Sequence, residues 1–127
     1  SSIAAPSAAG IPVTHRGVTH EFVVVSGHVA PGHPDSLVDW DALGRLRGTV
    51  VVLMAVERLA AIADALIAGG RPAETPAAVV ENATTGGQRT VRGTLATIAA
   101  DAAAADVVPP AVLVVGATAG FTAALGG

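Results

Sequence analysis

Several side chains of this 127-residue chain could do chemistry, but their spacing excludes the commonest kinds of site. All four histidines lie in the first third, and His15 and His20 are five residues apart, unlike the i, i+4 pair of a helical metal site. No serine stands in a Gly-x-Ser-x-Gly elbow, no Gly-x-Gly-x-x-Gly follows a strand, and cysteine is absent. The pattern therefore indicates surface or strand-end histidines, with no metal site and no serine or cysteine nucleophile.

The charged residues exclude further functions. Seven arginines and ten acidic residues give a net charge of −3, and the scattered arginines form no basic stripe, so we expect no nucleic-acid surface. The chain has no lysine, which removes Schiff-base chemistry. Asp39 and Asp41 would point to different sides of a short helix, which favours a solvated helix start over a catalytic pair. The absence of cysteine fits a cytoplasmic protein.

The elements that position these residues follow the order β, short α, β, α, β, β, α, β. Apolar runs and turn residues predict strands over residues 20–26, 49–56, 77–81, 89–92 and 111–115. Helices are predicted over 39–46, over 57–68 and from Thr94, as N-cap, to about residue 105. This order indicates one α/β domain, a mixed, mostly five-stranded sheet with helices on both faces. Small residues fill most of the core, so we expect the helices to pack closely on the sheet.

The residues that follow the strands are candidates for a ligand site, because ligands of open α/β sheets bind beyond the carboxyl ends of the strands. The candidates are Met54-Ala55, the segment from Glu81 to Thr85, and Gly116-Ala117. Small residues let a flat ligand approach the main chain, and methionine packs on aromatic rings. The alternative is that these are ordinary turns and that Met54 is a core residue.

The two ends of the chain carry their own signals. Residues 107–127 are uncharged and long enough to span a membrane, but their prolines and glycines favour a buried strand followed by a tail, so we expect no membrane segment. The chain opens at Ser1 without an initiator methionine or a charged n-region. We therefore expect a piece of a longer chain, or a processed product, rather than a signal peptide.

Taken together, several segments resemble the uroporphyrinogen-III C-methyltransferases of the tetrapyrrole methylase family. Residues 9–16, AGIPVTHR, resemble the family's AGIPLTHR, and residues 25–28, VSGH, resemble its VTGH. Leu53-Met54-Ala55 takes the place of YMG, and residues 76–95 resemble PAAVVENGTTxxQRVVRGTL. The match runs in order, with compatible spacing, from Ser1 to about Gly116.

The resemblance implies a fold, a reaction and partners. It implies the C-terminal domain of a two-domain, usually homodimeric enzyme, so that residues 1–127 lack the N-terminal domain. It implies S-adenosylmethionine as cofactor, with S-adenosylhomocysteine as product, and C-methylation of uroporphyrinogen III to precorrin-2 for sirohaem and cobalamin biosynthesis. The tetrapyrrole is then the substrate, and part of the apolar surface is interface with the other domain and the second subunit.

The resemblance also implies site residues. Ser1, Met54, Asn82 and Ala83 match cofactor-contacting positions, and Arg16 with His15 matches positions near the tetrapyrrole, where a guanidinium holds carboxylates bidentately. No residue is implied as acid, base or covalent nucleophile.

Two family glycines are replaced, at Ala55 and Ala83, where a Cβ crowds the ligand or excludes a positive φ. Two alternatives stay open: a catalytically incomplete half-domain that only binds cofactor or self-associates, and a sister methylase acting on a later corrin intermediate.

Overall fold

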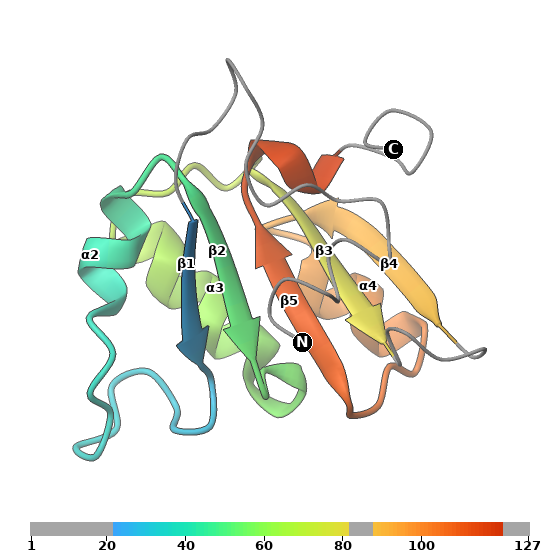
Figure 1. The fold of residues 1–127 in the computed structure, drawn as a ribbon, viewed down its shortest axis with the longest axis horizontal. Helices are drawn as coiled ribbons and strands as arrows, with labels where there is room; N and C mark the ends of the chain where they lie inside the picture. The colour runs from blue at the N-terminus through green and yellow to red at the C-terminus, as the bar shows by residue number, and fades with distance from the viewer. Residues whose placement is uncertain (1–21, 82–87, 121–127) are drawn as a thin grey trace.

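The computed structural model describes residues 22–81 and 88–120, which form one five-stranded mixed sheet with helices packed on it (Figure 1). The elements follow the predicted order: β1 (Phe22–Ser26), α2 (Trp40–Arg45), β2 (Thr49–Leu53), the 3-10 helix η1 (Val56–Arg58), α3 (Leu59–Ala68), β3 (Pro76–Glu81), β4 (Arg89–Thr94), α4 (Ile98–Ala104), β5 (Ala111–Val115) and the 3-10 helix η2 (Ala117–Gly120). The predicted fold class and order of elements are confirmed.

The strand order is β1-β2-β5-β3-β4, so the last strand of the chain lies in the middle of the sheet. β1 runs parallel to β2, whereas β5 runs antiparallel to both of its neighbours, β2 and β3. The carboxyl ends of β1, β2 and β3 therefore meet the beginning of β5 at one edge of the sheet, as the arrowheads in Figure 1 show.

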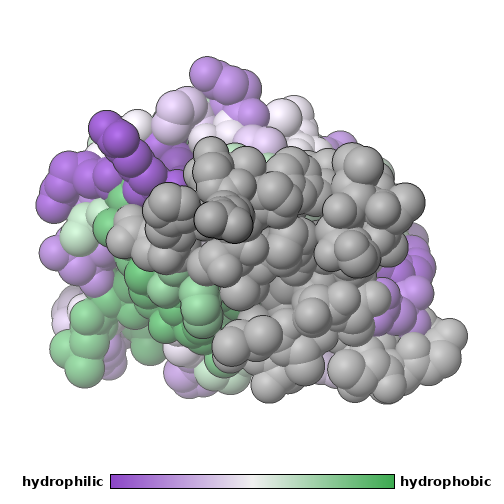
Figure 2. Space-filling view, turned by 45° about the horizontal axis from the view of Figure 1, so that its top comes forward, coloured by the Kyte–Doolittle hydropathy of each residue, from purple (hydrophilic) through white to green (hydrophobic). Residues whose placement is uncertain are grey.

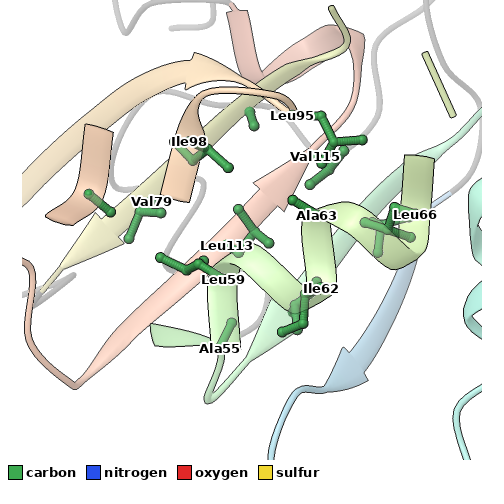
Figure 3. Close-up of a cluster of buried hydrophobic side chains, with 14 of the residues drawn as sticks. Ala55, Leu59, Ile62, Ala63, Leu66, Val79, Leu95, Ile98, Leu113 and Val115 are labelled. Carbon is green, nitrogen blue, oxygen red and sulfur yellow. The ribbon is translucent and has the colours of Figure 1, made fainter. Parts of the chain in front are cut away.

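The two faces of the sheet bury different residues. One face packs against α3 and α4, which lie behind the sheet in Figure 1, while α2 lies beside β1 and packs on α3. Its core contains Ile62 and Leu66 of α3, Leu113 of β5 and Val79 of β3, all 1% exposed or less (Figure 3). On the other face, alternate strand residues pack with Ala119 of η2; they are Val51, Ala78, Val80, Val112 and Val114. In the described part of the chain, all three α-helices thus lie on one side of the sheet, and the prediction of helices on both faces is met on the other side only by the four-residue 3-10 helix η2.

A glycine lets α2 and α3 approach each other closely. A Cβ placed on Gly44 would lie 2.5 Å from the carbonyl oxygen of Leu66 and 2.8 Å from the Cα of Gly69. A side chain would therefore hold the two helices apart. The start of α2 is as predicted, because the Asp39 carboxylate accepts the amide of Ala42 at 3.0 Å as the N-cap, while Asp41 is exposed in the first turn.

Two local predictions are wrong. The first is that the strand starting near residue 20 is buried: β1 lies at the sheet edge and is only half-buried, with Val24 37% exposed. Figure 2 shows apolar side chains gathered over β1 and β2 on the face that it draws.

The second error is the start of the last helix. Thr94 ends β4, and α4 begins four residues later with Thr97 as N-cap. The reason is that Thr97 Oγ1 accepts the Thr94 amide at 3.0 Å, while the amides of Leu95 and Ala96 donate to the carbonyls of Thr75 and Ala73. These bonds hold residues 95–97 in a turn between β4 and α4.

The uncharged end of the chain forms β5 and η2 as far as residue 120, which confirms the predicted buried strand. Within residues 22–81 and 88–120, no helix is long and apolar enough to cross a membrane.

Candidate functional site

A cleft of about 730 Å³ lies beyond the ends of the strands, on the side where β1, β2 and β3 end and β5 begins. Its walls come from the loop after β1, the end of β2 with η1, the end of β3, and the start of β5. The lining residues are His28, Leu53, Met54, Val56, Glu57, Arg58, Val80, Pro109, Pro110, Ala111 and Val112. The wall is largely apolar, with three polar side chains, which is the usual character of a small-molecule site.

Met54 is the predicted site residue that the structure places in this cleft. It follows β2 directly, its φ is +55°, and its side chain is 58% exposed. The alternative that Met54 is a core residue is therefore wrong. A non-glycine residue in the left-handed region is strained by roughly 1–2 kcal/mol, and such residues cluster at functional sites.

Ala55, the first replaced glycine, has an ordinary backbone conformation, with φ −98° and ψ −13°. It is 1% exposed and belongs to the helical-face core, and its side chain does not line the cleft. The positive φ thus falls on Met54, and Ala55 keeps a conformation that any residue adopts. The effect of a Cβ at position 55 on a bound ligand stays a prediction.

Glu81, the last residue of β3, holds a buried carboxylate beside the cleft; its side chain is 6% exposed. Oε1 accepts from Arg89 Nε at 2.8 Å, and Oε2 accepts from Arg89 Nη2 at 3.3 Å and from the Val108 amide at 2.7 Å. The hydrogen bonds from Arg89, which have the larger effect, and from the Val108 amide hold the pKa of Glu81 below its ordinary value. The same pairing raises the pKa of Arg89, so both groups are charged at neutral pH.

The remaining predicted site residues cannot be placed. Ser1, His15, Arg16, Asn82 and Ala83 lie outside the described residues. Among the strand ends, Met54 and Glu81 meet at one edge as expected, whereas Gly116 lies at the opposite edge, where its amide donates to Pro76. Grouping Gly116-Ala117 with the other two was wrong, because β5 is antiparallel to β2 and β3.

Sequence reasoning missed the wall formed by Pro109, Pro110 and the first residues of β5. It interpreted the two prolines only as a break, since the direction of the last strand cannot be read from an apolar run. The signal for this wall in the sequence was the uncharged segment Val108-Pro109-Pro110 directly before a predicted strand. Within the described part of the chain, no three potential metal ligands come together.

A family model for tetrapyrrole (corrin/porphyrin) methylases matches residues 1–99. The chain is 44% identical to the S-adenosyl-L-methionine-dependent uroporphyrinogen III methyltransferase of Methanosarcina barkeri over 116 residues, 91% of this chain and 46% of that protein. It is 41% identical to the uroporphyrinogen-III C-methyltransferase of Pseudomonas aeruginosa, with the same two coverages. The chain thus spans about half the length of these curated relatives.

Solved structures agree with this assignment. The uroporphyrin-III C-methyltransferase of Thermus thermophilus, complexed with S-adenosylhomocysteine, superposes with a TM-score of 0.72 at 37% identity, covering 87% of this chain and 48% of that one. A cobalt precorrin-4 methyltransferase gives a TM-score of 0.81 at 19% identity, which shows the fold alone. Since the family model matches well over half of the chain, the protein belongs to the tetrapyrrole methylase family.

Proposed function

We propose that this chain is part of an S-adenosylmethionine-dependent methyltransferase that C-methylates uroporphyrinogen III to precorrin-2, and that the cofactor binds in the cleft beside Met54. The observation that carries the proposal is the exposed, left-handed Met54 in an apolar cleft at the carboxyl ends of β2 and β3. Open α/β sheets bind ligands at such an edge. The relatives named above carry this activity in their names.

The residues of the cleft fit an adenosine-containing cofactor. A flat base matches the apolar wall, which includes Leu53, Val56, Val80 and the two prolines. A thioether packs well on an aromatic ring, so Met54 would lie along the base. We assign Ser1, Asn82 and Ala83 as further cofactor contacts. Arg16 and His15 would hold the acidic groups of the tetrapyrrole.

The protein's part in the reaction is to bind, orient and exclude water. The bound cofactor supplies a methyl group on a sulfonium, open to displacement by an electron-rich pyrrole carbon. Holding that carbon in line with the methyl group lowers the barrier by saving the entropy of encounter. The apolar wall of the cleft keeps water from the reacting atoms. No residue of the chain is assigned as acid, base or covalent nucleophile.

We further propose that the protein acts in the cytoplasm as a homodimer, together with an N-terminal methylase domain. The absence of cysteine fits a reducing compartment. The half-exposed edge strand β1 and the apolar side chains gathered over β1 and β2 offer contact area for such partners (Figure 2).

Calorimetric titration of the protein with S-adenosylhomocysteine tests the cofactor site. We expect saturable heat and a higher thermal unfolding temperature, because a ligand that binds only the folded state stabilises it. The Met54→Ala variant should bind more weakly, whereas Ala61→Ser, on the exposed side of α3, should bind as the parent does. No heat and no thermal shift at millimolar ligand would refute the cofactor site in this chain.

A second candidate is a half-domain that binds the cofactor without turnover or only self-associates, and it rests on the half-length match to the relatives. Incubation with S-adenosylmethionine and uroporphyrinogen III separates the candidates. A product with two added methyl groups supports the methyltransferase, and binding without product supports the second candidate. Turnover of a later corrin intermediate, but not of uroporphyrinogen III, would indicate a sister methylase.

A further inference from the structure

The segment before β5, residues 108–110, forms one wall of the cleft and has few backbone donors and little buried surface to fix it. Pro109 and Pro110 both line the cleft, and proline has no backbone amide to donate. Within residues 108–110, Val108 therefore carries the only backbone donor. Its side chain is 56% exposed, so burial of apolar surface contributes little to fixing this segment.

The Val108 amide donates to the carboxylate of Glu81, at 2.7 Å. Glu81 itself is fixed by the sheet, because it pairs with Arg89 of β4 on one side and with Ala111 of β5 on the other. The bidentate bond from Arg89 orients the carboxylate, and hydrogen bonds to a charged acceptor are about twice as strong as neutral ones. A rigid, charged acceptor thus meets the one donor that the segment has.

We infer that Glu81 is a positioning residue, whose carboxylate holds the Pro109-Pro110 wall of the cleft through the amide of Val108. Arg89 orients that carboxylate, and Asp106 acts on Arg89 through its charge. The consequence for the cofactor rests on the proposed function, but the hold on the wall does not. In this arrangement Glu81 shapes the cleft without lining it.

Two variants separate the hold on the wall from general stability. Glu81→Leu and Arg89→Leu both remove the ion pair, but only Glu81→Leu removes the acceptor of the Val108 amide. Amide hydrogen exchange by NMR reports the difference. In Glu81→Leu we expect exchange at Val108 to speed up roughly tenfold to a hundredfold, the worth of a hydrogen bond to a charged group. In Arg89→Leu we expect a change of less than about threefold, since that bond remains.

Val114 of β5 is the internal control, because it is fully buried in the central strand of the sheet, and we expect its amide to exchange by global opening. An equal acceleration at Val108 and Val114 in Glu81→Leu would mean that Glu81 stabilises only the whole domain, and would overturn the inference. If Glu81→Leu does not fold, the parent protein decides the question. The Val108 amide proton shift should then titrate in acid together with the Glu81 carboxylate, and independence of the two would overturn the inference.

The effect on the cofactor is measured separately. We expect the Kd for S-adenosylhomocysteine to rise about tenfold in Glu81→Leu, which loses the bond to the Val108 amide. In Arg89→Leu, which keeps that bond, we expect the Kd to rise less than about threefold. Equal losses in both variants would overturn the effect of the wall on binding. If the parent does not bind S-adenosylhomocysteine at all, the proposed function of this chain fails, while the Val108 measurements still decide the role of Glu81.

Discussion

Met54 is the residue lining the cleft that has a positive φ, and this backbone conformation predicts how two substitutions there affect stability. Met54 has φ +55°, a conformation that glycine adopts freely and other residues adopt at a cost. Replacing it with alanine or with glycine removes the same exposed side chain. The two variants then differ only in whether residue 54 has a Cβ in the left-handed region.

The magnitude follows from two opposing terms. The left-handed conformation costs a residue with a Cβ roughly 1–2 kcal/mol, and the alanine variant keeps that cost. Glycine avoids it but loses about 0.5–1 kcal/mol through the greater freedom of its unfolded chain. We therefore expect Met54→Gly to be more stable than Met54→Ala by about 0.5–1 kcal/mol, or about 2–4 °C in Tm for a domain of this size.

Urea and thermal denaturation followed by circular dichroism measure this difference. Ala61, exposed on α3, is the matched control, because a helical residue has negative φ and glycine there costs about 1 kcal/mol. The alanine-to-glycine change should thus have opposite signs at positions 54 and 61. If Met54→Gly is no more stable than Met54→Ala, the left-handed turn at the cleft is refuted.

Three further predictions concern packing and charge. Gly44→Ala should lower the free energy of unfolding by roughly 1–3 kcal/mol, since its Cβ would lie 2.5 Å from the Leu66 carbonyl oxygen. Ile62→Ala should lower it by about 2–5 kcal/mol, because Ile62 is fully buried in the core between α3 and the sheet. Since the folded pKa of Glu81 is depressed, chiefly by Arg89, its stabilising contribution should be present above the unfolded value, about pH 4.3, and be lost as pH falls through the folded pKa.

Denaturant midpoints check the first two, with Ala60→Ser on the exposed side of α3 as a variant that should leave stability unchanged. A Gly44→Ala protein as stable as the parent would mean that α2 and α3 are not in backbone contact. Unfolding free energies between pH 2 and 6 check the third. An Arg89→Leu protein should lose less stability than the parent over that range, and an equal loss would contradict the pairing.

Local patterns predicted the fold well. The β-branched runs of β2 and β5, the Gly69-Gly70 stop after α3 and the Asp39 N-cap all act over a few residues, so the sequence alone reveals them. The start of α4 was wrong because the Thr97 hydroxyl and two backbone bonds from residues 73–75 compete with the Thr94 cap. Such competition involves residues twenty positions apart and leaves no local pattern.

The site was only half predictable for the same reason. Met54 and Glu81 were found because Met54 directly follows a strand and Glu81 ends one, and the sequence marks both strands. The direction of β5 is set by its pairing with both β2 and β3, and this pairing brings Pro109 and Pro110 into the cleft. The resemblance to the family supplied Met54 with a role, but the positive φ of Met54 and the ordinary φ of Ala55 could be assigned only from the backbone geometry.

The central claim is that S-adenosylmethionine binds in the cleft beside Met54. Met54 is the only methionine of the chain, so protein labelled with ¹³C at the methionine methyl group gives one signal, which reports on this cleft alone. Titration with S-adenosylhomocysteine should move that signal in a saturable manner, with the same Kd as calorimetry gives, because the proposed site places an aromatic base over the thioether. A signal that stays in place at saturating ligand would contradict the account.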